Sequence, residues 1–222
     1  MKRKAHPGKI QERSLLHGGG AQKIKHKPLK HFSNNNKLLY LFRFMSDVIT
    51  ISDKQFKPYI AQQKMDEAVK AIATRINTEL KDEQPLFLAV LNGSFMFASD
   101  LMKEITIPCQ ISFIKVASYQ GVSSSGAVTE LIGLTENLHG RTVVIIEDIV
   151  DTGLTVEKLV HLLEEKQVKQ IRIASALLKT DAYKKSIKID YVGHNIRNEF
   201  VVGYGLDYNG FGRNLKEIHI LA

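Results

Sequence analysis

The segment Val143–Thr155 limits the possible fold more than any other part of this sequence. It begins with four consecutive β-branched residues, Val143–Ile146. Because successive side chains of a strand point to opposite faces of the sheet, a strand that is apolar at every position must be covered on both faces. Such coverage is typical of parallel sheets with helices on either side. The segment therefore predicts an α/β fold with a mainly parallel sheet.

Other parts of the chain alternate between strand and helix patterns. Apolar residues between Met65 and Leu80 recur at steps of three and four, which predicts an amphipathic helix. Further helices are expected through Met102 and over 155–167. Short apolar runs predict buried strands at 86–91, 111–117, 142–146 and 171–178, and a return strand at 128–134 after the Ser- and Gly-rich segment 118–126. This alternation predicts parallel βαβ units with right-handed crossovers.

Charge divides the chain into two parts. Residues 1–44 contain 11 Lys and Arg and one acid, whereas residues 45–222 contain 20 Lys and Arg and 22 acids. The first part also lacks apolar periodicity before Leu38. We therefore predict a basic, flexible extension over 1–44 and one folded domain over 45–222. A basic tail can bind nucleic acid or anionic lipid, but a solvated or non-native tail is the interpretation we favour.

Composition argues against several classes of protein. The apolar runs are far shorter than the roughly 20 residues of a membrane-spanning helix, so no membrane association is expected. Cys109 is the only cysteine, and the folded part has no clustered histidines, so neither an internal disulfide nor a structural zinc site is expected. A secretory signal is not expected either, because the first apolar stretch follows a long polar segment. These features indicate a cytoplasmic protein.

Two adjacent acids, Glu147 and Asp148, follow the apolar run toward its carboxyl end, where open α/β sheets bind their ligands. Burial of a carboxylate without a partner is costly, so we expect both acids to face a crevice, a cation or hydroxyl donors. The small polar loop 151–155 then enters a helix, whose free N–H groups and dipole favour phosphate. An ordinary capped turn explains the loop alone, but it does not explain the paired acids. Together these features predict a ribose-phosphate site.

The segment Val143–Thr155 resembles the phosphoribosyl diphosphate (PRPP) binding motif of the type I phosphoribosyltransferases. Residues 91–97 resemble the family's pyrophosphate loop, and Ser118-Tyr119 resembles the pair in its mobile catalytic loop. Lys179, after two leucines, resembles the lysine that meets a purine oxygen. Residues 200–209, with Arg213 beyond them, are similar to the purine-binding tail of the hypoxanthine-guanine phosphoribosyltransferases. The resemblance runs from about Asp53 to the C-terminus, in the family's order.

The resemblance implies a type I phosphoribosyltransferase fold, with a central mainly parallel sheet, flanking helices and a small hood subdomain. It implies transfer of the phosphoribosyl group from PRPP to hypoxanthine or guanine, release of pyrophosphate, Mg²⁺ as cofactor, and a homodimer or homotetramer. Nucleic acid is not expected as a partner. Two alternatives stay open: a PRPP-sensing regulator that binds nucleic acid through the extension, and a homologue that prefers xanthine.

The resemblance also implies roles for particular residues. The catalytic residues would be Asp151, which accepts a proton from the base, Ser118 and Tyr119. The residues that bind PRPP would be Glu147, Asp148, Asp151, Thr152, Gly153, Leu154, Thr155, Leu91, Asn92, Gly93 and Arg213. The residues that bind the purine would be Lys179, Phe200, Val201 and Asp207. Magnesium would be held by Glu147, Asp148 and Asp207.

Two of these positions also have a purely structural interpretation, and two others depart from the family pattern. Taken alone, Lys179 also fits a surface lysine and Phe200 a core aromatic. Asn92 and Leu154 stand where many relatives have lysine. We therefore expect the two phosphate loops to bind through backbone N–H groups rather than through cationic side chains.

Overall fold

The computed structural model describes residues 48–117, 129–132 and 136–222. The extension over 1–44, its boundary with the folded domain, and the catalytic pair Ser118 and Tyr119 lie outside these residues. Predictions about them therefore stay predictions.

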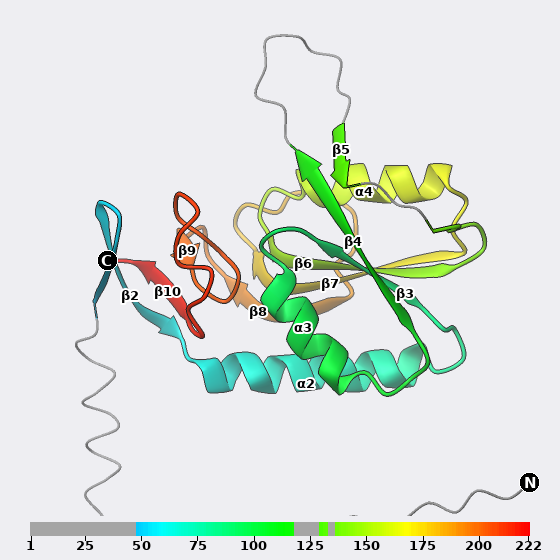
Figure 1. Ribbon diagram of the computed structural model, residues 1–222, viewed down its shortest axis with the longest axis horizontal. Coiled ribbons are helices and arrows are strands. Elements are labelled where there is room, and N and C mark those ends of the chain that lie inside the picture. The colour runs from blue at the N-terminus through cyan, green and yellow to red at the C-terminus, as the bar shows by residue number, and fades with distance from the viewer. Residues whose placement is uncertain (1–47, 118–128, 133–135) are drawn as a thin grey trace, which may run out of the picture.

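The larger of two sheets has the strand order β5-β4-β3-β6-β7-β8 within the described residues. Its strands are β3 (Leu86–Val90), β4 (Gln110–Ala117), β5 (Thr129–Ile132), β6 (Thr142–Val150), β7 (Gln170–Lys179) and β8 (Tyr191–Ile196). Neighbours are parallel except β5, which runs antiparallel to β4. Helices α2 (Gln62–Glu79) and α3 (Phe95–Glu104) cover one face and α4 (Leu154–Glu165) the other (Figure 1). The predicted parallel α/β sheet is confirmed.

Strand β6 separates two apolar cores. Val144 and Ile146 pack in the cluster that contains the buried residues of α2 and α3, whereas Val143 and Ile145 pack with those of α4. All four side chains are fully buried. This arrangement is the two-sided coverage that an uninterrupted β-branched run requires. No helix in the described part of the chain is long and apolar enough to cross a membrane.

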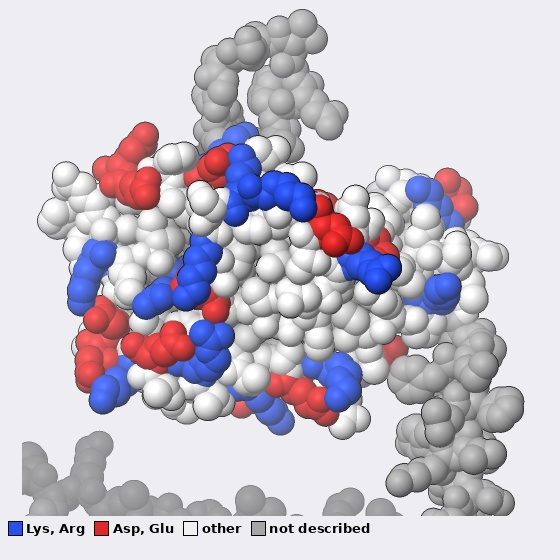
Figure 2. Space-filling view, turned by 180° about the vertical axis from the view of Figure 1, so that it is seen from behind, with Lys and Arg blue, Asp and Glu red and all other residues white. Residues whose placement is uncertain are grey.

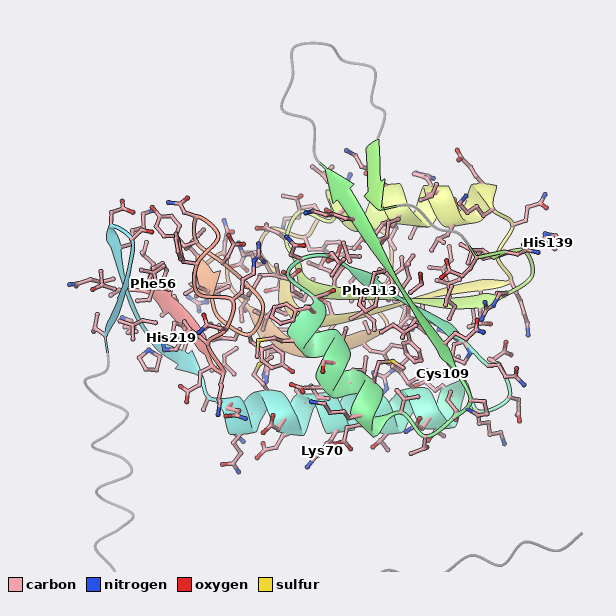
Figure 3. All side chains as sticks on the ribbon, in the orientation of Figure 1. Phe56, Lys70, Cys109, Phe113, His139 and His219 are labelled. Atoms are coloured by element: carbon pink, nitrogen blue, oxygen red, sulfur yellow. The ribbon has the colours of Figure 1, made fainter. Side chains whose placement is uncertain are left out.

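A smaller antiparallel sheet, the hood, has the order β1-β2-β10-β9. Its strands are β1 (Ile49–Ile51), β2 (Lys54–Ile60), β9 (Val201–Val202) and β10 (Ile218–Leu221). Phe56 is its central apolar side chain and packs with Ile51 and Val202 (Figure 3). Figure 1 places the hood at one end of the larger sheet, whereas Cys109 and His139 lie toward the opposite end (Figure 3).

The structure differs from the sequence predictions in two respects. The strand predicted over 142–146 continues to Val150, because Glu147, Ile149 and Val150 still pair with β7. The four hood strands and β8 were not predicted. The hood strands are short, and β2 carries alternating polar residues and a proline, so their pairing depends on partners far away in the chain.

Candidate active site

The connection from β6 to α4 forms a cradle for an anion. Gly153 has a φ of 83°, and a Cβ there would lie 2.5 Å from the ring of Tyr183, so both backbone and space require glycine. No side chain caps the helix N-terminus. Thr152, Leu154 and Thr155 are exposed around it. The first-turn N–H groups of α4, together with the helix dipole, therefore face a site suited to phosphate.

The two acids lie inside β6, and Glu147 is only 5% exposed. Burial, and then the charge of Asp148, raises the pKa of Glu147 well above its usual value. Burial also raises the pKa of Asp148. The hydrogen bond from the N–H of Ile149, at 2.9 Å, and the charge of Arg213 act in the opposite direction and lower it. Burial therefore favours the neutral form of Glu147 more than that of Asp148.

Three segments that are distant in sequence meet at Asp148. A Cβ on Gly93 would lie 1.5 Å from Asp148 Oδ2, so the loop after β3 passes directly beneath this carboxylate. Gly205 has a φ of 100°, and a Cβ there would lie 1.9 Å from the carbonyl oxygen of Gly93. Leu91 and Asn92, joined by a cis peptide bond, precede Gly93, and Asn92 is exposed. The predicted pyrophosphate loop, the acids and the predicted purine tail therefore converge.

Asp151 and Lys179 form an ion pair in which Lys179 Nζ lies 2.7 Å from Asp151 Oδ2. The pair forms because β6 and β7 are parallel neighbours in register, with Val150 opposite Leu178. The side chain of Lys179 is 12% exposed and that of Asp151 47%. Lys179 is therefore not a surface lysine, and a ligand can reach the carboxylate beside it.

Asp207 and Arg213 form a second ion pair, with Nη2 of the arginine 2.5 Å from Oδ1 of the aspartate. Arg213 Nη1 also donates to the carbonyl oxygen of Gly205 at 2.8 Å, and the N–H of Gly210 donates to Asp207 Oδ2 at 2.6 Å. Asp207 is thus already engaged within the tail. Arg213 lies close enough to Asp148 to affect its pKa.

The three residues predicted to hold magnesium do not form one ligand cluster. Among the described residues, no group of three or more His, Cys, Asp or Glu is arranged to hold a metal. Magnesium in phosphate-transfer sites commonly takes one or two carboxylates and completes its shell with water and substrate oxygens. The Glu147–Asp148 pair and, separately, Asp207 fit a cation of that kind, which would arrive with a diphosphate.

Phe200 and Val201 differ in their surroundings. Val201 is 6% exposed, and β9 pairs it with Ile220. Phe200 is 43% exposed, its ring centroid 6.2 Å from that of Phe56 and 5.7 Å, edge-on, from that of Tyr208. Phe200 is therefore not a core residue, and part of its ring is free to stack on a flat ligand.

No individual role was predicted for Gly205, Tyr183 or Tyr208, although Gly205 and Tyr208 lie within the predicted purine-binding tail 200–209. The alternating glycines at 203 and 205, inside an apolar run, are a signal of close backbone approach that could have identified the first of them. No comparable sequence signal marks the two tyrosines, because their contacts depend on chain segments that only the fold brings together.

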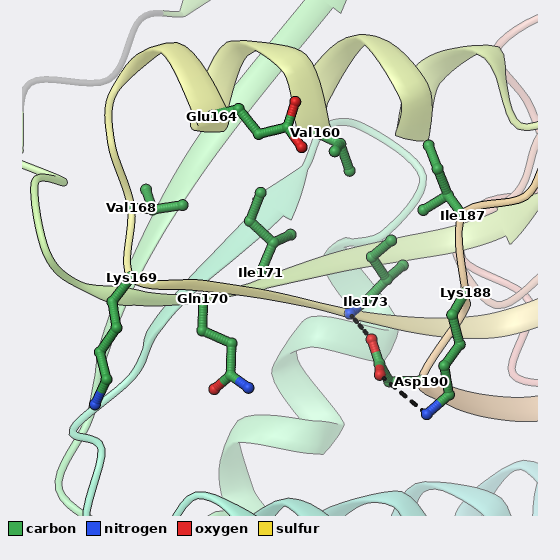
Figure 4. Close-up of a pocket in the computed structure, with 10 residues that line it drawn as sticks. All are labelled: Val160, Glu164, Val168, Lys169, Gln170, Ile171, Ile173, Ile187, Lys188 and Asp190. Atoms are coloured by element: carbon green, nitrogen blue, oxygen red, sulfur yellow. Dashed lines mark hydrogen bonds and ion pairs between the residues drawn. The ribbon is translucent and has the colours of Figure 1, made fainter.

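A pocket on another part of the described surface does not share these features. The pocket in Figure 4 lies between α4 and the start of β7, and it is lined in part by apolar side chains, Val160 from α4 and Ile171 and Ile173 from β7. It has neither the acid pair nor the anion cradle. On the face shown in Figure 2, acidic and basic side chains are interspersed, as expected of a domain with nearly balanced charge.

Comparison with known proteins places this geometry in a family. Residues 57–209 match the phosphoribosyl transferase domain. The chain is 39% identical over 166 residues to the hypoxanthine-guanine phosphoribosyltransferase of Bacillus subtilis, covering 74% of this chain and 92% of that protein. It superposes with a TM-score of 0.70 on the hypoxanthine-guanine phosphoribosyltransferase of Bacillus anthracis, at 33% identity and with 75% of this chain and 96% of the other covered.

A hypoxanthine phosphoribosyltransferase from Staphylococcus aureus gives the same TM-score at 34% identity, covering 75% of this chain and 92% of that one. The sequence identity exceeds 30% over nearly the full length of these proteins, and the fold is the same. The similarity therefore extends beyond a shared architecture. The chain therefore belongs to the hypoxanthine-guanine phosphoribosyltransferases, within the phosphoribosyl transferase domain family.

Proposed function

We propose that this enzyme transfers the 5-phosphoribosyl group from PRPP to hypoxanthine or guanine. The observation that carries the proposal is the Asp151–Lys179 ion pair at the edge of an uncapped helix N-terminus. A proton acceptor and a hydrogen-bond donor for an oxo group thus lie beside a phosphate cradle. Regulators that only sense PRPP have no use for such a base-facing pair.

In the proposed reaction a ring nitrogen of the purine forms a bond to C1′ of PRPP. The bond between C1′ and the diphosphate oxygen breaks, and its electron pair leaves with pyrophosphate. The proton of the ring nitrogen passes to the carboxylate of Asp151, which must turn from Lys179 toward the base. Lys179 then donates to the 6-oxo oxygen. The sugar carries positive charge in the transition state, so Asp148 stabilises it electrostatically.

The remaining contacts follow the charges of PRPP. Backbone N–H groups over 152–155 bind the 5′-phosphate, and the loop 91–93 with Arg213 binds the diphosphate. Glu147 and Asp148 bind the ribose hydroxyls. Mg²⁺, when bound, spreads the negative charge of the leaving diphosphate. A cytoplasmic location and a homodimer or homotetramer stay predictions.

A PRPP-dependent assay with hypoxanthine, guanine, xanthine and adenine in parallel tests the proposal. We expect products from hypoxanthine and guanine and none from adenine, because the 6-amino group of adenine would set a donor against the Lys179 ammonium. Preferential use of xanthine would identify the enzyme as a xanthine-preferring homologue. Absence of product from every base would instead favour a PRPP-sensing regulator.

A further inference from the structure

A polar and aromatic cluster on the hood joins the turn before β2 to the tail. The hydroxyl of Tyr208 donates to Asp53 Oδ1 at 2.7 Å. Lys54 Nζ lies 4.8 Å from the centroid of the Tyr208 ring. The hydrogen bond lowers the pKa of Asp53 and raises that of Tyr208. Asp53 and Lys54 precede residues 57–209, so this part of the cluster comes from outside the family match.

The cluster continues to Phe200. Lys54 Nζ lies 5.6 Å from the centroid of the Phe200 ring, and Tyr208 meets the same ring edge-on at an interplanar angle of 87°. Phe56, which is fully buried, lies behind both aromatic rings at 6.2 and 6.0 Å. The ring of Phe200 is therefore partly exposed yet contacted by two aromatic rings and one cation.

The backbone of Phe200 is held by the same sheet. Its carbonyl oxygen accepts a hydrogen bond from the N–H of Leu221 at 3.1 Å, and Leu221 pairs with Phe56 in β2. Strand β2, which begins at Lys54, thus fixes both the backbone and the ring environment of Phe200. A shift of the β1–β2 turn would move the contacts around the ring together.

We propose that Asp53, Lys54 and Tyr208 form a clamp that positions Phe200 to stack on the purine, an inference that rests on the proposed function. A stacking ring binds more tightly when it is already held in its bound orientation, because less conformational entropy is lost. The ammonium of Lys54 is attracted to the faces of both rings, and Asp53 fixes the orientation of Tyr208. All three are positioning residues: Lys54 and Tyr208 act on the ring of Phe200, and Asp53 acts on it through Tyr208.

Steady-state kinetics of Lys54 variants test the cationic part of the clamp, with the purine varied at saturating PRPP and then PRPP varied at saturating purine. Lys54→Met is expected to raise KM for hypoxanthine and for guanine by about 2- to 5-fold, the factor typical of an exposed cation–π contact, and to leave kcat and KM for PRPP unchanged. Lys54→Arg keeps the charge and should restore the wild-type KM. Lys57→Met, an exposed lysine on the same strand, is the matched control and should have no effect.

A double-mutant cycle tests the hydrogen bond. Asp53→Ala and Tyr208→Phe each remove the same bond, so each single variant and the double variant should raise the purine KM by about the same factor. Asp53→Asn keeps an acceptor oxygen and should have a smaller effect. Additive effects of the two substitutions, or an effect on kcat and on KM for PRPP as large as that on purine KM, would overturn the clamp.

Phe200→Leu separates failure of the clamp from failure of the proposed function. If Phe200→Leu raises the purine KM while Lys54→Met and Tyr208→Phe do not, the clamp is wrong and the base site survives. If Phe200→Leu is also silent, the assignment of Phe200 to the base is wrong, and the clamp is overturned with it.

Discussion

At the scale of single residues, the acids of the site differ in their environments. Glu147 and Asp148 are adjacent in sequence but differ in environment: Glu147 is buried in β6, whereas Asp148 accepts a backbone hydrogen bond and lies near Arg213. Asp151, three residues later, is half exposed and paired with Lys179. Neighbouring carboxylates on one segment can therefore take different roles.

Asp151→Asn tests the role of general base. The amide still contacts Lys179 but cannot accept a proton, so kcat should fall by about 10²-fold or more while calorimetric binding of PRPP is retained. Asp181→Asn, an exposed aspartate shortly after β7, is the control and should leave kcat unchanged. A kcat near that of wild type would remove Asp151 from the base role.

Glu147→Gln tests the raised pKa of the buried Glu147 carboxyl group. A carboxyl whose native pKa is raised holds its proton after the unfolded chain has lost it, so its stability contribution is full below the unfolded value near 4.5 and is lost as pH rises toward the native pKa. The variant should therefore lose less thermal stability than wild type between pH 4 and pH 8. Each pKa unit is about 1.4 kcal/mol, or roughly 3–6 °C in Tm for a domain of this size.

Glu165→Gln, on the exposed side of α4, is the matched control for this pH series. Its Tm should follow the wild-type curve at every pH. Parallel pH profiles for wild type and Glu147→Gln would mean that Glu147 is ionised in the native state.

At the scale of elements, the site is made by the carboxyl ends of neighbouring strands and by the hood that reaches them. Parallel pairing of β6 with β7 brings Asp151 to Lys179, and the loop after β3 passes under Asp148. The loop that follows β9 of the hood then contributes Gly205, which packs against the carbonyl of Gly93. Each contact depends on an element having the correct register with its neighbour.

Gly93→Ala tests this convergence. The new methyl group would overlap the Asp148 carboxylate, so the loop or the acid must move, at a cost of about 1–3 kcal/mol. We expect PRPP affinity to fall at least about tenfold and Tm to drop. Asn92→Ala, at the exposed neighbouring position, should change both much less. Wild-type PRPP affinity in Gly93→Ala would show that the loop does not hold the diphosphate.

At the scale of the whole molecule, the described fold begins at residue 48. Its cores are built from residues 49 onward, and the family match begins at residue 57. The hood joins the two ends of the folded part, because β2 near its start pairs with β10 at its end. Removal of residues before β1 and removal of β1 with part of β2 should therefore have different consequences.

Deletion of residues 1–44 should leave kcat, KM for PRPP and Tm close to those of the full chain, since none of the described core residues is removed. Deletion of residues 1–56 is the contrasting variant. It removes Ile51 and Phe56 from the hood core and should lower Tm and raise the purine KM. A large rise in KM for PRPP after the shorter deletion would make the extension part of the catalytic domain.

Local sequence patterns determined most of the larger sheet. The uninterrupted β-branched run of β6, the helical periodicity over 65–80 and the acids before Asp-Thr-Gly predicted a parallel α/β sheet with a phosphate site at its carboxyl end. These features can be predicted because the spacing of apolar residues within each element indicates which of its faces is buried. The order and register of the strands then placed Asp151 beside Lys179.

The resemblance predicted a hood subdomain, but only the tertiary structure decided the strand pairing of the hood and the electrostatic state of the site. Phe56 pairs with Leu221, and Tyr208 binds Asp53, across most of the folded chain, and neither contact has a local signal. The burial that raises the pKa of Glu147 comes from its neighbours in the fold, not from its position in the motif. Pairing between distant short strands and the desolvation of a charge both depend on the complete set of contacts, which no single segment of sequence contains.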